Sequence, residues 1–148
     1  MKHPFTFLFL VAAFFSAVDN APATTDVIGI VKATSGEVFI TRTHTVHPVA
    51  PLMKLSEGDL IVTGPTGSVG LIFNDDTVAS LGPNSQFVVD AFHFNPAEQE
   101  LSFVSRLIKG TFCFITGQIA KLAPDKVQFT TPEATLGVRG TKFLVKID

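Results

Sequence analysis

The sequence predicts an all-β protein, either a short-stranded β-solenoid-like fold or a rolled β-sandwich, with one short helical turn. Apolar and polar residues alternate in many short runs, and glycine, proline or Asx turn sequences separate the runs. Almost no stretch keeps a helical period for three turns. The pairs Gly64-Pro65 and Gly82-Pro83 each precede a serine that is followed by an apolar run. This weak internal repeat is compatible with the solenoid-like fold and with the rolled sandwich.

The N-terminus is typical of a secretory signal peptide over residues 1–23. Lys2 precedes an apolar run from Phe5 to Val18, and the small residues Ala21 and Ala23 follow it. The run is shorter than the roughly 17 to 25 residues that span a bilayer as a helix. We therefore expect cleavage after Ala23 rather than a retained anchor. The mature chain, residues 24–148, would then be one domain that does not span the membrane.

Composition excludes several classes of protein. The formal net charge is −2, without the basic excess that nucleic-acid binders carry. The single cysteine cannot form an internal disulfide, which excludes a disulfide-stapled extracellular scaffold. The chain has fifteen Phe but no Trp or Tyr, so its aromatic residues are expected in the core, and a glycan site built on aromatic stacking is disfavoured.

Period-two spacing assigns an inward face to three strands. The inward side chains are Val38 and Ile40 in residues 37–41, Val69, Leu71 and Phe73 in residues 68–73, and Phe143, Val145 and Ile147 in residues 142–147. Further strands are predicted at residues 27–33, 59–63, 77–81, 85–94, 100–107, 111–116 and 126–130. Only residues 117–123, which end at Pro124, resemble a short helical turn.

Turn sequences separate these strands at residues 57–59, 64–67, 74–77, 82–85 and 95–96. Asn74-Asp75-Asp76-Thr77 also offers oxygen ligands of the kind that calcium prefers. No further acidic residues follow at the spacing of a calcium-binding loop, so a tight hairpin turn is the favoured interpretation.

The chain contains no convincing catalytic or metal-binding group. His44 and His47 are three residues apart, but their threonine and proline neighbours indicate a hairpin or loop rather than a helical metal site. Cys113 would need a partner such as His93 to act as a nucleophile, and Thr111 and Ile115 on its own strand face suggest a packed, inert thiol. We therefore expect no enzyme activity, no metal and no cofactor.

Arg139 stands between Gly137 and Gly140 just before the last predicted strand. Its guanidinium carries five donors and is suited to tying turn carbonyls or a carboxylate together. We expect Arg139 to bridge turns of its own fold, and a contact with a partner is the alternative.

Five short segments, read in order, closely resemble the FecR-type domain over roughly residues 28–147. They are residues 58–64, 67–73, 81–85, 109–111, and 131–132 with 137–141. The motif residues are Gly58, Asp59, Gly64, Gly82, Pro83, Asn84, Gly110, Gly137, Arg139, Gly140 and Thr141. The resemblance implies a non-catalytic, all-β domain of the bacterial envelope.

In the sigma-regulator members of that family, this domain relays the state of an outer-membrane receptor to a cytoplasmic sigma factor. No sigma-binding segment precedes the apolar run here, so the resemblance implies a free-standing binding or scaffolding module in the periplasm or outside the cell. An envelope protein is the expected partner. The final strand is the candidate edge for it, through Thr141, Lys142, Val145 and Ile147. The alternative is a domain that binds a cell-wall glycan or peptide, and the oligomeric state is open.

Overall fold

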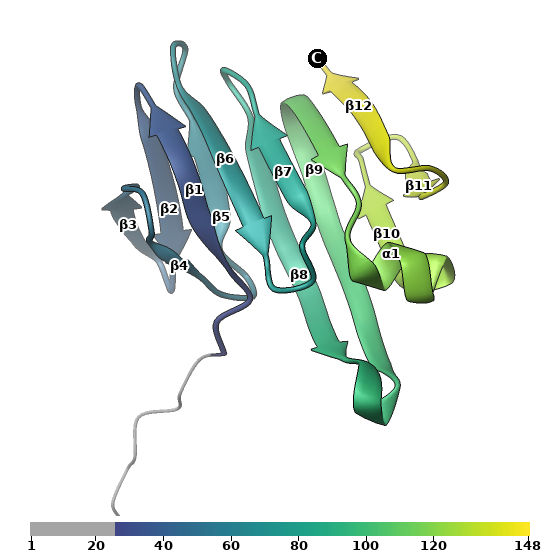
Figure 1. The fold of residues 1–148 in the computed structure, drawn as a ribbon. Coiled ribbons are helices and arrows are strands. Elements are labelled where there is room, and N and C mark those ends of the chain that lie inside the picture. Colours follow the sequence, from purple (N-terminus) through teal and green to yellow (C-terminus); the bar gives the residue numbers. More distant parts are fainter. Residues whose placement is uncertain (1–25) are drawn as a thin grey trace, which may run out of the picture.

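The computed structural model of the protein describes residues 26–148, so the predicted signal peptide lies outside the described residues. The described chain forms a largely antiparallel sheet that rolls over on itself (Figure 1). Its two halves, which we call sheet A and sheet B, share the long strand β9 (Glu100–Ile115). The prediction of an all-β fold with one short helical turn is confirmed.

Sheet A contains the second part of β9, with β7 on one side and β12 on the other. Its strands, in spatial order, are β4 (Lys54–Leu55), β1 (Gly29–Ser35), β6 (Ser68–Phe73), β7 (Val78–Leu81), β9 and β12 (Lys142–Ile147). All these pairs are antiparallel.

Sheet B contains the first part of β9. Its strands, in spatial order, are β3 (Thr45–Pro48), β2 (Val38–Arg42), β5 (Leu60–Thr63), β8 (Gln86–Asn95), β9, β10 (Val127–Thr130) and β11 (Thr135–Gly137). β9 and β10 run parallel, and the other pairs are antiparallel. A solenoid would stack its coils through parallel strands, so this pairing supports the rolled-sandwich alternative.

β9 passes from one sheet to the other at Gly110. The sequence predicted two strands here, residues 100–107 and 111–116, and that division is wrong because the structure has one continuous strand. Gly110 has a φ of 110°, and a side chain there would overlap Ser85. Glycine lets the strand bend over at this end of the molecule while its pairing with neighbours continues (Figure 1).

The core lies between the two sheets and is rich in phenylalanine. Phe87 of β8 faces Phe112 and Phe114 of sheet A, at ring-centroid distances of 6.1 and 5.9 Å. Phe73 of β6 meets Phe103 of β9 edge-on at 5.0 Å. The inward faces predicted for β2 and β6 are confirmed, since Val38, Ile40, Val69, Leu71 and Phe73 are all buried. The phenylalanines therefore supply the largest of the buried side chains, and isoleucine, leucine and valine side chains fill most of the rest of the core.

The short helix α1 (Gln118–Leu122) follows β9 and precedes a 3₁₀ turn, η2 (Pro124–Lys126). A second 3₁₀ turn, η1 (Pro96–Glu98), joins β8 to β9. Three short strands were not predicted as strands: β3, β4 and β11. β4 and β11 have two and three residues, and β3 buries none of its four side chains, so none of the three shows an alternating pattern in the sequence.

Candidate functional site

Five of the motif residues gather at the end of the roll where β9 bends over. Gly64 follows β5, Gly82, Pro83 and Asn84 form the turn after β7, and Gly110 lies within β9. The Asn84 N–H donates to the Gly64 carbonyl at 3.1 Å, and the Gly82 N–H donates to the Thr111 carbonyl at 2.9 Å. These residues therefore join two turns and the bend of β9, which are far apart in the sequence.

A buried pair of hydroxyls holds this end together. The Thr63 hydroxyl donates to the Gly82 carbonyl at 2.6 Å and accepts the Ser85 N–H at 2.8 Å. The Ser85 hydroxyl donates to the same Gly82 carbonyl at 2.8 Å and accepts the Thr111 N–H at 3.1 Å. Thr63 and Ser85 were not singled out in the sequence, although Ser85 directly follows the Gly82-Pro83-Asn84 turn. The cluster is structural, because its polar groups satisfy one another.

The same end of the molecule lies beside the last strand. A hollow of about 310 Å³ is lined by Pro83, Asn84, Gly110, Lys146 and Ile147, together with Lys109, Thr111 and Asp148. Motif turns and the candidate partner edge therefore meet at one surface, which links the structural cluster to the strand proposed for binding.

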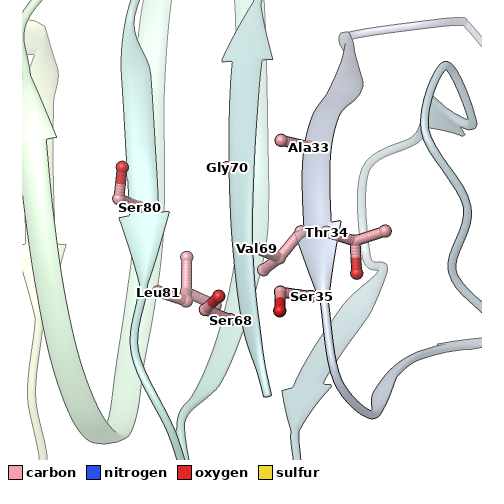
Figure 2. A pocket seen from close by; sticks show the side chains of 8 residues that line it. All are labelled: Ala33, Thr34, Ser35, Ser68, Val69, Gly70, Ser80 and Leu81. Carbon is pink, nitrogen blue, oxygen red and sulfur yellow. The ribbon is translucent and has the colours of Figure 1, made fainter.

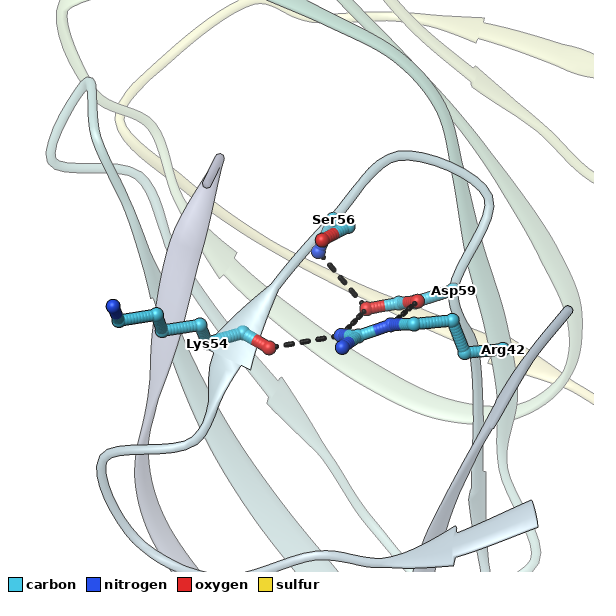
Figure 3. A network of polar contacts seen from close by, with 4 residues as sticks. All are labelled: Arg42, Lys54, Ser56 and Asp59. Carbon is cyan, nitrogen blue, oxygen red and sulfur yellow. Dashed lines mark hydrogen bonds and ion pairs between the residues drawn. The ribbon is translucent and has the colours of Figure 1, made fainter. Parts of the chain in front are cut away.

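Asp59 lies in a different part of the roll and forms a buried ion pair (Figure 3). Arg42 donates from Nε to Asp59 Oδ1 at 2.8 Å and from Nη2 to Oδ2 at 2.6 Å, and Oδ2 also accepts the Ser56 N–H at 2.9 Å. The Arg42 Nη2 donates further to the Lys54 carbonyl at 2.9 Å. The hydrogen bond to Asp59 raises the pKa of Arg42, although burial opposes this.

The Asp59 pair fixes the segment between β4 and β5 to the end of β2. Gly58, beside Asp59, has a φ of 82° and donates its N–H to the Val89 carbonyl at 2.8 Å. Sequence reasoning did not find Arg42, because no local pattern connects it to a carboxylate seventeen residues later. Asp59 and Gly58 are therefore structural in this chain.

The turn between β6 and β7 uses its carboxylate internally. Asp75 is fully buried, and its carboxylate accepts the Thr77 N–H at 3.1 Å, the Thr77 hydroxyl at 2.8 Å and the Ile119 N–H at 3.3 Å. The hairpin interpretation of residues 74–77 is confirmed, and the turn also anchors the start of α1. These donors occupy the oxygens that a calcium ion would need.

Arg139 differs from its expected role. Its side chain is exposed, and its guanidinium makes no hydrogen bond or ion pair with any of residues 26–148. The predicted bridge between turns is therefore not formed, because the connector from β11 to β12 carries Arg139 to the surface. The neighbouring Gly137, Gly140 and Thr141 are also exposed. The carbonyls of Gly140 and Thr141 reach Thr116, directly after β9, and accept its hydroxyl at 3.1 Å and its N–H at 2.9 Å, respectively.

Arg139 instead borders a groove of about 760 Å³. The groove lies beside β10 and β11 and is lined by Pro124, Asp125, Val127, Gln128, Thr135, Leu136, Gly137, Val138 and Arg139. Its volume falls in the range of small-molecule sites, and its lining combines apolar side chains with one cation and one carboxylate.

Among residues 26–148, Cys113 and its candidate partner His93 lie toward opposite ends of β9 and do not form a reactive pair. Cys113 is half-buried, but it lies on the outer face of sheet A, whereas Phe112 and Phe114 point into the core. The expected packing among Thr111 and Ile115 is therefore wrong, since both are exposed. His93 pairs with Ser102 toward the other end of β9. Across the described range, no three His, Cys, Asp or Glu side chains are arranged to hold a metal ion.

A shallow groove of about 250 Å³ also crosses the outer face of sheet A (Figure 2). It runs over the small residues Ala33, Gly70 and Ser80 of three adjacent strands. The residues that line it include no titratable side chain. The groove therefore offers serine and threonine hydroxyls but no acid or base in its lining to activate them.

The candidate partner edge is an edge strand in the structure. Among strands of residues 26–148, β12 pairs with β9 alone, and Leu144 lies opposite Cys113. Lys142, Leu144 and Lys146 point outward, while Phe143, Val145 and Ile147 face the core and are half-buried. Leu144 is 72% exposed.

Comparison with known proteins gives one result. The sequence matches the family described as "FecR protein" over residues 59–148. No curated protein and no solved structure matches the chain. Within residues 26–148, no helix combines the length and the hydropathy needed to cross a membrane. The family match covers more than half of the sequence and includes the β12 edge, and the chain belongs to the FecR family.

Proposed function

We propose that this FecR-domain protein is exported and acts in the bacterial envelope as a non-catalytic module that binds another protein by strand addition at β12. Family membership supports a role in the envelope, related to signalling. The observation that carries the binding proposal is the free edge of β12, a six-residue strand that presents an exposed leucine. A second strand added here would gain backbone hydrogen bonds and cover apolar side chains.

The other edges of the sheets are less suited to strand addition. β3 has four residues and ends in Pro48, which lacks an N–H to donate. β4 has two residues and β11 has three. β12 is therefore the longest free edge in the described part of the chain.

The backbone of β12 has a defined set of free groups. The Thr141 carbonyl accepts the Thr116 N–H, so Thr141 and Thr116 form a hydrogen-bonded pair. Along an antiparallel pair of strands, hydrogen-bonded and non-hydrogen-bonded residue pairs alternate. By that alternation, Phe143 and Val145 bond to β9, whereas the N–H and C=O groups of Lys142, Leu144 and Lys146 face the open edge. Proline at position 145 would therefore damage the sheet itself, but proline at 144 removes only an N–H that a partner would use.

The test compares two proline variants in affinity capture from envelope extract of the host. Leu144→Pro should lose the captured envelope protein, while Val46→Pro should retain it. Val46 is a matched control, since it is a 59% exposed apolar residue on the edge strand β3. Arg42 and Thr45 form the hydrogen-bonded pair that closes the β2–β3 hairpin, so the N–H of the next residue, Val46, faces the open edge as that of Leu144 does. Equal capture by the two variants, both folded, would contradict the proposal.

A second candidate function is binding of a cell-wall peptide or glycan in the groove beside β10 and β11. The observation that favours it is the exposed Arg139 guanidinium at the rim of an apolar groove, which is suited to a ligand carboxylate. Titration of the mature protein with purified peptidoglycan fragments should show saturable binding that Arg139→Ala weakens. Binding unaffected by this substitution would remove the groove as the site.

A further inference from the structure

The outer face of β12 carries two cations around one exposed leucine. Lys142, Leu144 and Lys146 alternate with the half-buried Phe143, Val145 and Ile147. The exposed ion pair of Lys146 with Asp148, at 3.7 Å, is the only one that the described chain makes with these lysines. Such an exposed pair is weak and is easily exchanged for another carboxylate.

The inner face of the same strand leaves the core partly uncovered. Phe143 stacks on Phe114 at a centroid distance of 5.2 Å and contacts Phe129 edge-on at 5.3 Å. Phe114 and Phe129 are almost fully buried, whereas Phe143 and Val145 are only half-buried. The core therefore stops at β12, with apolar surface that an added strand would cover.

The positive charges disfavour a second copy of the chain as the occupant. Two β12 strands paired antiparallel about Leu144 would place Lys142 of each copy opposite Lys146 of the other. Like charges directly opposite on a sheet are destabilising, and opposite charges are stabilising. The nearby Lys109 lines the same hollow as Lys146 and adds to the positive field.

We propose, on the basis of strand addition at β12, that its occupant is an extended segment of an envelope protein with the pattern acidic, apolar, apolar, apolar, acidic. The two carboxylates lie opposite Lys142 and Lys146, and the central apolar residue lies against Leu144. The two flanking apolar residues lie beside Phe143 and Val145 and extend the core. The pattern reads the same in both chain directions, so it fits a parallel or an antiparallel strand.

The test uses two short peptides with polar flanks, one containing Glu-Val-Leu-Val-Glu and the other Lys-Val-Leu-Val-Lys, titrated against the mature full chain. At low salt the acidic peptide should bind roughly tenfold more tightly than the basic peptide. The acidic peptide forms two favourable cross-strand charge pairs with Lys142 and Lys146, whereas the basic peptide forms two repulsive ones. The preference should reverse in the double variant Lys142→Glu, Lys146→Glu. A matched control, Lys32→Glu with Lys121→Glu, changes net charge equally and should keep the preference of the wild type.

Amide hydrogen exchange then locates the peptide. Protection should appear at the Lys142, Leu144 and Lys146 amides of the wild type, and protection at Lys142 and Lys146 should be lost in Leu144→Pro. Thermal melts confirm that each variant is folded. Equal affinity for the two peptides, with protection at Leu144, would overturn the acidic pattern while leaving strand addition intact. Absence of binding at millimolar peptide, or binding of the acidic peptide unaffected by Leu144→Pro, would also overturn this inference. The capture experiment with Leu144→Pro and Val46→Pro tests the proposed function separately.

Discussion

The ion pair between Arg42 and Asp59 gives a quantitative prediction. In Arg42→Met, Asp59 loses both charge-assisted hydrogen bonds and keeps only the Ser56 N–H. Its side chain is 3% exposed, whereas that of Arg42 is 35% exposed. Breaking a buried pair from one side costs about 3 to 5 kcal/mol, and we expect about 3 kcal/mol here because water reaches the arginine side.

The assay is urea unfolding of residues 24–148, supported by thermal melts. A loss of about 3 kcal/mol corresponds to a melting temperature lower by about 10 °C for a domain of this size. Because the pKa of Arg42 is raised, its contribution is fully present below the ordinary arginine pKa and is lost only in strongly alkaline solution. Measurement at neutral pH therefore reports the whole effect.

A matched control is available in the Arg106 pair with Asp90. Its Nε to Oδ2 distance is 2.8 Å, but the two side chains are 53% and 35% exposed. Arg106→Met should cost less than about 1 kcal/mol. The reasoning would be refuted if both methionine variants lowered the free energy of unfolding by the same amount.

Three further predictions concern the bend, the β6–β7 turn and the thiol. Gly110→Ala should destabilise the fold by at least about 3 kcal/mol, because the alanine side chain would overlap Ser85. Gly140→Ala, at a similar positive φ but with open space around it, should cost about 1 to 2 kcal/mol. Equal unfolding free energies for the two variants would contradict the steric argument. Asp75→Ala should cost about 2 to 4 kcal/mol in urea unfolding by leaving buried N–H groups without acceptors, and added calcium should not change the melting temperature of the wild type. Cys113 should react with a maleimide in the native state without unfolding, as measured by mass spectrometry and circular dichroism, and no reaction before denaturation would show that its outer face is covered.

Strands with long alternating runs could be predicted from the sequence, because successive side chains of a strand point to opposite faces and the apolar ones face the core. Residues 68–73 alternate except at Ile72, and the structure places β6 at those residues with Val69, Leu71 and Phe73 inward. The fold class follows from several such runs separated by turns. β9 shows the limit of this reasoning, because Gly110 has the appearance of a turn residue but serves a bend inside one strand.

Faces and long-range partners were harder to predict. Cys113 sits between two phenylalanines, so period two alone leaves open which set faces the core, and the larger phenylalanines take it. Asp59 was identified as a motif residue, but its partner Arg42 depends on how β2 and β5 pair. Arg139 was assigned a bridging role from its donor capacity, whereas its place in an exposed connector decides its environment.

The most direct test of binding at β12 is site-specific photo-crosslinking in living cells of the host. A photoreactive phenylalanine analogue replaces Leu144 in one strain and Val46 in another, and the mature proteins are recovered after irradiation. We predict a crosslink to one envelope protein from position 144 and none to that protein from position 46. A crosslink to that protein from position 46 alone, equal crosslinks from both positions, or no crosslink from position 144 in a folded, exported protein would contradict strand addition at this edge.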